Sequence, residues 1–67
     1  MPTILEFSTE MYRLALQMKD ARSKRYYLRR GRELAAQHDH FGATVNLRNL
    51  VLEARQRLEK ADREDRS

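Results

Sequence analysis

The sequence predicts a small all-α domain of two or three helices, two of which form an antiparallel αα-hairpin. Only two glycines and one proline occur among the 67 residues, so long stretches are free of helix breakers. Apolar residues recur at alternating steps of three and four, which is the period of an amphipathic helix. Residues 37–42, QHDHFG, interrupt this period with turn-forming residues. These observations predict helices over residues 4–20, 23–38 and 43–63.

The first helix is expected to begin at Ile4, because Thr3 and Glu6 form the capping box T-x-x-E. In this motif the threonine hydroxyl accepts a hydrogen bond from the backbone of the first turn. The apolar stripe of this helix comprises Ile4, Phe7, Met11, Leu14, Met18 and Ala21.

The second helix follows without an intervening glycine or proline, yet its apolar stripe points in another direction. The new stripe comprises Tyr27, Leu28, Gly31, Leu34, Ala35 and His38. One explanation is a bend near residues 20–23, with Asp20 or Ser23 as the N-cap of a second helix. The other is one long helix that presents two faces to two neighbours. We favour the bend, since a short domain must fold back on itself to bury its stripe.

The third helix has the most regular amphipathic pattern in the chain. Its stripe comprises Ala43, Leu47, Leu50, Val51, Ala54, Leu58 and Ala61. Residues 1–63 are expected to form a single domain, with residues 64–67 as a frayed polar tail. The expected core comprises Ile4, Phe7, Met11, Leu14, Met18, Leu28, Leu34, Leu47, Leu50, Val51 and Leu58.

The second and third helices are predicted to pair as the hairpin, with Gly31 and Ala43 as small residues that allow a close approach. The spacing of Tyr27, Gly31, Leu34 and Ala43 is similar to that in the helical hairpin of a tetratricopeptide repeat. The resemblance covers residues 24–57 and implies hairpin geometry alone. Arg55 stands where such a repeat has its terminating proline.

The size and composition of the chain limit how it can be stabilised. A domain this short buries only about 60% of the surface that its unfolded chain exposes. There is no cysteine, so a disulfide cannot help. Self-association or a stable protein partner is therefore expected. No apolar run approaches the roughly 20 residues that span a bilayer, and no secretory leader is recognisable. We expect a soluble, cytoplasmic protein that does not bind membranes.

The sequence holds few residues that could support catalysis. A glycine-rich phosphate loop and the G-x-S-x-G motif are both missing. His38, Asp39 and His40 form the only cluster of metal-ligand types, and two histidines in one turn do not supply the three or four ligands of a zinc site. We therefore predict no catalytic residue, no metal site, no cofactor and no enzymatic activity.

Positive charge is concentrated in residues 22–32, RSKRYYLRRGR. This segment has six basic and no acidic side chains, whereas the segments on either side each carry a net charge of −1. On a helix, Arg22, Arg25, Arg29 and Arg32 fall within about 80° of arc beside the apolar stripe. We call these four residues the Arg ladder; Tyr26 borders it. Only Glu33 lies near its end, so the arginines must find anions elsewhere.

Three sources of anions are open. Acidic residues near the end of the third helix, such as Glu53, Glu59 and Asp62, could neutralise the ladder internally. An acidic protein could bind it through forked arginine–carboxylate hydrogen bonds, with Tyr26 as an anchor. Nucleic acid could place its phosphates on the same four arginines.

Val45 and Leu52 lie seven residues apart and off the main stripe of the third helix, so they are predicted to be exposed. We call this pair the seam, a candidate surface for a dimer or a partner. The leading prediction for function is thus a non-enzymatic protein-interaction module, such as an adaptor, small chaperone or inhibitor. It would present the Arg ladder and an apolar helix face to a protein. The alternative is a regulator that binds nucleic acid through the ladder.

Overall fold

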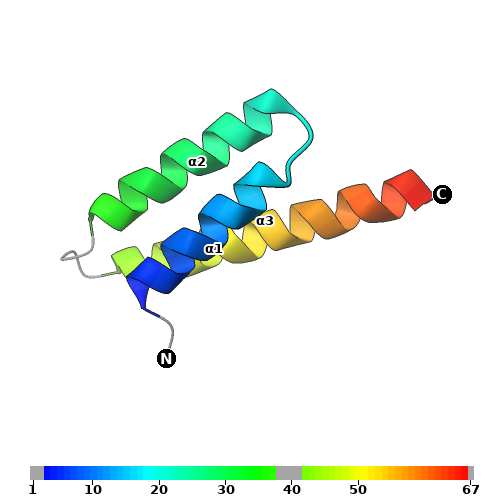
Figure 1. The fold of residues 1–67 in the computed structure, drawn as a ribbon. Helices are drawn as coiled ribbons and strands as arrows, with labels where there is room; N and C mark the ends of the chain where they lie inside the picture. The colour runs from blue at the N-terminus through cyan, green and yellow to red at the C-terminus, as the bar shows by residue number, and fades with distance from the viewer. Residues whose placement is uncertain (1–2, 38–41, 67) are drawn as a thin grey trace.

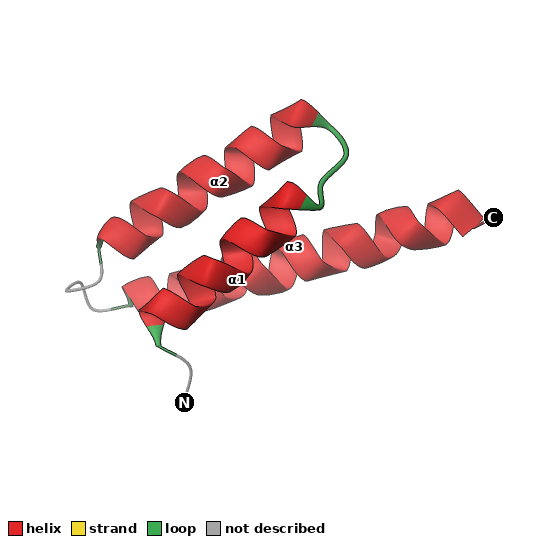
Figure 2. Ribbon diagram, viewed as in Figure 1, coloured by secondary structure: helices red, strands yellow, loops and turns green. Residues whose placement is uncertain are grey.

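The computed structural model describes residues 3–37 and 42–66, with the side chains of residues 65 and 66 left aside. Over these residues it contains three helices, α1 (Ile4–Leu16), α2 (Ala21–Ala36) and α3 (Ala43–Arg66), and no strand (Figures 1 and 2). Every pair of helices is in contact. α2 runs antiparallel to both neighbours, and α3 extends well beyond the other two at its C-terminal end (Figure 1). The predicted all-α class and the antiparallel hairpin are confirmed.

The start of α1 follows the expected cap, and its end comes earlier than predicted. The Thr3 hydroxyl accepts a hydrogen bond from the backbone N–H of Glu6 at 3.2 Å. The helix ends at Leu16 rather than residue 20. The N–H groups of Gln17 and Met18 turn back to the carbonyls of Leu14 and Ala15, each at 3.1 Å. These bonds between residues three apart tighten the last turn and satisfy its carbonyls.

The bend between α1 and α2 is confirmed, and Asp20 is the residue that caps α2. Its backbone is extended, and its carboxylate accepts a hydrogen bond from the N–H of Ser23 at 2.9 Å. The Ser23 side chain, together with this backbone N–H, holds the pKa of Asp20 below its usual value by hydrogen bonding to the carboxylate. Because Asp20 must leave the helical conformation to cap α2, α1 cannot continue to it. For the same reason α2 begins at Ala21, two residues before the predicted start at 23.

The two remaining boundaries also differ from the prediction. α2 ends at Ala36 rather than residue 38, and the expected turn residues 38–41 lie outside the described part of the chain. Gly42, just before α3, has a φ of 91°, which glycine adopts without strain. α3 continues to Arg66, past the predicted end at 63, because neither glycine nor proline interrupts the segment. Residues 64–66, expected in a frayed tail, are therefore helical here.

The core lies between the three helices, where their buried faces meet. The buried apolar residues are Met11, Leu14, Ala15, Met18, Tyr27, Leu34, Ala43, Leu47, Leu50, Val51 and Ala54. Tyr27 belongs to this set although the predicted core left it out. Four predicted members are only partly buried and pack against the rim of the core. These are Ile4, Phe7, Leu28 and Leu58.

Gly31 is needed for close helix packing, but against a different helix from the one predicted. A Cβ atom at position 31 would lie 2.8 Å from Cγ of Met11, closer than such atoms approach. The glycine therefore lets α2 approach α1 rather than α3. Ala43, its predicted partner in the hairpin, is buried at the start of α3.

Among the described residues, no helix combines the length and the apolar character needed to cross a bilayer.

Candidate functional site

The Arg ladder lies on the outer face of α2, exposed to solvent along its length. The buried face of this helix is formed by Ser23, Tyr27, Gly31 and Leu34. These residues centre almost opposite the ladder on the helical wheel, at 100° per residue. The prediction from sequence placed the ladder beside the apolar stripe, because Leu28 was counted as a core residue. In the structure Leu28 is half-buried and lies between the core face and the ladder.

Internal counter-charges leave most of the ladder unpaired. Arg29 Nε lies 4.0 Å from Oε1 of Glu33. The other carboxylate oxygen of Glu33, Oε2, pairs with Arg30 Nη1 at 3.3 Å. Neither Arg22, Arg25 nor Arg32 forms an ion pair with an acid in residues 3–37 or 42–64. Of the acids of α3 that could have neutralised the ladder, Glu53 and Glu59 form no ion pair with it within the described part of the chain.

Glu53 interacts instead with Tyr27, on the buried face of α2. The Tyr27 hydroxyl donates to a carboxylate oxygen of Glu53 at 3.0 Å, and Arg57 Nη1 donates to that hydroxyl at 3.4 Å. The guanidinium of Arg57 also lies 5.9 Å from the centre of the Tyr27 ring. Burial raises the pKa of Tyr27, so its hydroxyl stays protonated and able to donate. Tyr26 packs edge-on against Tyr27, with ring centres 5.0 Å apart, and this contact holds Tyr26 beside the ladder.

The ladder surrounds a hollow whose lining is partly apolar. The hollow has a volume of about 630 Å³ and is lined by Arg22, Arg25, Tyr26, Leu28, Arg29 and Arg32. A second hollow, between α1 and α2, is lined by Ser8, Met11, Tyr12, Tyr27, Leu28, Gly31, Arg32 and Ala35. Leu28 and Arg32 line both hollows, so the two are neighbours on the surface. The basic face of α2 therefore extends to α1.

Three large apolar side chains of α1 are exposed on one strip, which we call the α1 stripe. Leu5, Tyr12 and Leu16 expose 73%, 57% and 50% of their surface. At 100° per residue they lie within about 40° of arc, well away from the buried face of α1. The prediction from sequence missed this stripe, although the spacings of seven and four residues could have revealed it.

The seam residues are exposed as predicted, but they lie on a different part of the surface from the ladder. Val45 and Leu52 border a groove of about 590 Å³ between α1 and α3. The groove is lined by Phe7, Thr44, Val45, Arg48, Val51, Leu52 and Arg55. It shares no residue with the ladder hollow, so the structure does not bring the two predicted surfaces together.

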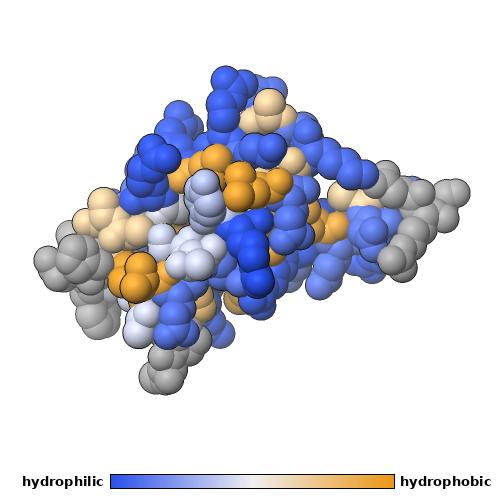
Figure 3. All heavy atoms as spheres, in the orientation of Figure 1, coloured by the Kyte–Doolittle hydropathy of each residue, from blue (hydrophilic) through white to orange (hydrophobic). Residues whose placement is uncertain are grey.

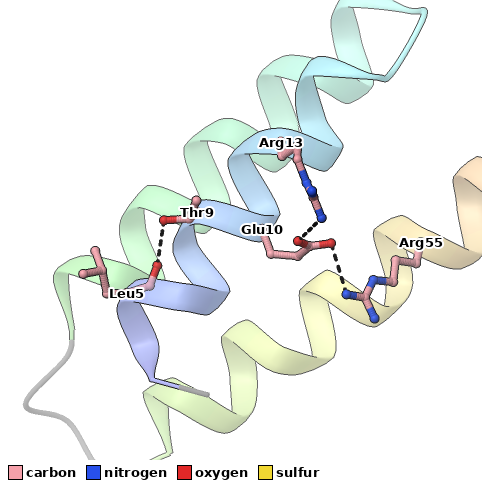
Figure 4. A network of polar contacts seen from close by, with 5 residues as sticks. All are labelled: Leu5, Thr9, Glu10, Arg13 and Arg55. Atoms are coloured by element: carbon pink, nitrogen blue, oxygen red, sulfur yellow. Dashed lines mark hydrogen bonds and ion pairs between the residues drawn. The ribbon is translucent and has the colours of Figure 1, made fainter. Parts of the chain in front are cut away.

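A polar bridge joins α1 to α3 beside the seam groove. The Glu10 carboxylate accepts a hydrogen bond from Arg55 at 3.0 Å and also pairs with Arg13 (Figure 4). The Arg55 hydrogen bond is the main reason that the pKa of Glu10 is lowered. On the same helix, the Thr9 hydroxyl donates to the carbonyl oxygen of Leu5 at 3.0 Å. Arg55 is thus bound by an acid of the fold, whereas Arg22, Arg25 and Arg32 form no ion pair within the described residues.

Candidate metal ligands do not gather in the described residues. Over residues 3–37 and 42–64 there is no group of three histidine, aspartate or glutamate side chains placed to hold an ion. The cluster His38, Asp39 and His40 lies outside these residues, so the prediction made for it is not tested.

The chain matches no protein-family model, and comparisons with characterised proteins and with solved structures find no similar protein.

Proposed function

We propose that this protein is a non-enzymatic protein-interaction module whose Arg ladder docks an acidic partner in the cytoplasm. The observation that carries the proposal is that Arg22, Arg25 and Arg32 lie on an exposed helix face and form no ion pair with an acid in residues 3–37 or 42–64. Neighbouring arginines on a helix repel one another by a few tenths of a kcal/mol per pair. An external anion removes this repulsion, and arginine offers carboxylates two parallel hydrogen bonds.

The lining of the ladder hollow favours protein over nucleic acid. Tyr26 and Leu28 lie among the four arginines, and the neighbouring hollow, which shares Leu28 and Arg32, is lined by Tyr12 of α1. A protein partner can cover these side chains with apolar groups while its carboxylates meet the arginines. A phosphate backbone has no apolar group for Leu28. Tyrosine and arginine are also the residues that most often dominate binding energy in protein interfaces.

Nucleic acid remains the second candidate because of the ladder's shape. From Arg22 to Arg32 it extends about 15 Å along one helix face, at 1.5 Å per residue. Exposed Tyr26 beside it offers a ring on which a base could stack. If four arginines neutralise four phosphates of a duplex, the affinity should fall with salt at a log–log slope of about −3.6.

The test compares two variants with the same change in net charge. Arg25→Glu with Arg29→Glu inverts the centre of the ladder, and Lys60→Glu with Arg63→Glu makes the matched change at exposed positions of α3. Each tagged protein is used to capture proteins from a cell extract treated with nuclease, followed by mass spectrometry. In parallel, labelled 20-base-pair DNA and RNA duplexes are titrated with each protein from 50 to 300 mM salt.

The proposal expects an enriched set of acidic proteins with the wild type and with the α3 control, and at least a tenfold loss with the ladder variant. Retention that is equal for the two variants would contradict the role of the ladder. Tight, steeply salt-dependent duplex binding that only the ladder variant loses would replace the protein partner with nucleic acid.

Self-association belongs to the same proposal, with the seam residues Val45 and Leu52 as its surface. Light scattering during size-exclusion chromatography measures the mass directly. We expect Leu52→Asp to convert any dimer to a monomer while far-UV circular dichroism stays unchanged, since Leu52 is exposed. A dimer that survives this change would place the interface elsewhere.

A further inference from the structure

The side chains of the α1 stripe are all at least half exposed, and they fall on one strip of the helix rather than being scattered singly. The core of α1 is formed by Met11, Leu14 and Ala15 on another face of the helix. Single exposed apolar residues are normal on protein surfaces, whereas contiguous groups of them mark binding sites. Figure 3 shows hydrophobic side chains on the face of the molecule that carries α1, bordered by hydrophilic ones.

The packing of α1 against α2 places this stripe beside the Arg ladder. Met11 contacts Gly31, and the two helices run antiparallel. Counting in opposite directions from this contact, Tyr12 lies level with residues 28–32 and Leu16 lies level with residues 25–28. Tyr12 and Arg32 line the same hollow, which confirms this register. The stripe and the ladder therefore follow neighbouring helices, whose axes are typically 8–10 Å apart.

Charge is distributed asymmetrically across this joint surface. Arg32 lines a hollow together with residues of α1, and Arg25 lies about 20° from Arg32 on the helical wheel, so both are on the side of α2 nearest α1. Neither forms an ion pair with a described acid. On α1, the Glu10 carboxylate is bound by Arg55 of α3. The surface thus has an apolar strip along α1 and a basic border along α2.

Charge complementarity decides what can cover this surface. A second copy of the chain, docked through the same face about a two-fold axis, would bring arginines toward arginines. Nucleic acid would meet the arginines but leave the leucines of α1 exposed to water. A helix with an apolar ridge and acidic residues along one flank satisfies both parts of the surface. Such helices dock in grooves through apolar residues at positions i, i+3 or i+4, and i+7.

We propose that the face formed by the α1 stripe, Leu28, Arg25 and Arg32 binds an acidic amphipathic helix of a partner protein. Its apolar ridge covers the α1 stripe, and its carboxylates bind the two arginines. From Leu5 to Leu16 the stripe extends about 16 Å, which matches about three turns of the bound helix. The inference rests on the proposed function for the acidic character of the partner. It adds that the partner binds as a helix and that its apolar side chains contact the α1 stripe.

The experiment uses a fluorescent 18-residue peptide with leucines at three- and four-residue spacing, glutamates along one flank, and capped termini. One control peptide has the same composition with the leucines scattered around the helix. A second has lysine in place of glutamate, and a third is oligo-glutamate of the same length. Binding to the full chain is measured by fluorescence anisotropy at 100 mM salt, with a 20-base-pair DNA duplex as a separate probe.

Three variants separate the parts of the surface. Leu5→Gln with Leu16→Gln removes the apolar stripe, and Arg25→Gln with Arg32→Gln removes the basic border. Lys60→Gln with Arg63→Gln is the matched control, because it removes two exposed positive charges from α3, at positions that take no part in either proposed surface. All of these positions are exposed, and circular dichroism verifies that each variant is folded.

The inference expects the amphipathic acidic peptide to bind at least tenfold more tightly than the scattered or lysine peptide. The stripe and border variants should each weaken this binding tenfold or more, and the control should change it less than twofold. Equal binding by wild type and stripe variant, or no binding of the peptide, overturns the inference. If oligo-glutamate binds as well as the amphipathic peptide and only the border variant loses it, the acidic partner stands and the helical one fails. Binding of the duplex alone overturns both proposals.

Discussion

Replacing Gly31 with alanine tests the close contact between α1 and α2, because two effects of opposite sign compete at this position. Alanine in place of glycine inside a helix stabilises it by about 1 kcal/mol. The added methyl group would lie 2.8 Å from Cγ of Met11, which is 1% exposed and has little room to move. Overpacking of this kind costs about 1–3 kcal/mol. The net effect expected for Gly31→Ala is therefore between neutral and about 2 kcal/mol of destabilisation.

The sign should reverse when Met11 is shortened. In a Met11→Ala background the nearest remaining atom of residue 11 is Cβ, at the ordinary contact distance of 3.6 Å. Gly31→Ala should then stabilise the protein by about 1 kcal/mol, the helix-propensity term alone. The coupling between the two positions should accordingly be about 1–3 kcal/mol.

Urea denaturation followed by circular dichroism at 222 nm measures these differences. The difference between Arg29→Ala and Arg29→Gly, at an outward position of the same helix, gives the propensity term without the contact. Met11→Ala alone should cost about 2–5 kcal/mol. That is a large part of the free energy of unfolding of roughly 3–10 kcal/mol that is expected for a 67-residue domain. The wild type, the two single variants and the double variant are therefore compared in a stabilising osmolyte. If Gly31→Ala stabilises the wild type as much as the Arg29 pair indicates, the close approach is refuted.

Three further substitutions test the interior and the cap. Leu47→Ala, at a fully buried site, should lower the free energy of unfolding by about 2–5 kcal/mol. Leu52→Ala, on the exposed side of α3, should lower it far less. Equal shifts in the urea midpoint would contradict the assigned core. Tyr27→Phe removes the hydrogen bond to Glu53 and should cost about 0.5–1.5 kcal/mol at neutral pH. Because the pKa of Tyr27 is raised above its ordinary 10.0, the wild type should also lose stability as the pH rises above that value, and the variant should lack this part of the alkaline slope. The pKa of Asp20 is lowered in the folded protein, so its carboxylate stabilises the fold above its ordinary pKa of 3.8, and this stability is lost as the pH falls through the lower folded pKa. Asp20→Asn can still cap α2, and its free energy of unfolding should fall less on acidification than that of the wild type. An unchanged dependence of stability on pH would argue against the capping carboxylate.

The local signals in the sequence were sufficient for the three helices and for the first residues of α1 and α3, whereas the other four helix ends differ from the prediction by two to four residues. Thr3 and Asp20 cap α1 and α2 because their short oxygen-bearing side chains reach backbone N–H groups three residues ahead. Once Asp20 is taken as the cap of α2, α1 must end before it, because the backbone of the cap is extended. Leu28 was assigned to the core because periodicity cannot tell a core position from one at its rim.

The candidate site was only half predictable. The ladder, Tyr26 and the exposure of Val45 and Leu52 follow from helical spacing alone. Whether acids of α3 neutralise the ladder depends on how the helices are rotated about their axes, and spacing along one helix holds no information on this. The α1 stripe was missed because the stronger apolar stripe of the same helix accounted for its amphipathic pattern.

The sequence by itself indicated two or three amphipathic helices, favoured a bend near residues 20–23, and placed a row of arginines on the second helix, since each feature depends on residues within a few turns of one another. Tertiary structure decided which surfaces adjoin. It placed Gly31 against Met11 of α1, and so set the register that brings Tyr12 and Leu16 alongside the ladder. It also placed Val45 and Leu52 in a separate groove. These relations arise from side-chain fit between helices distant in sequence, and the periodicity of a single helix does not encode them.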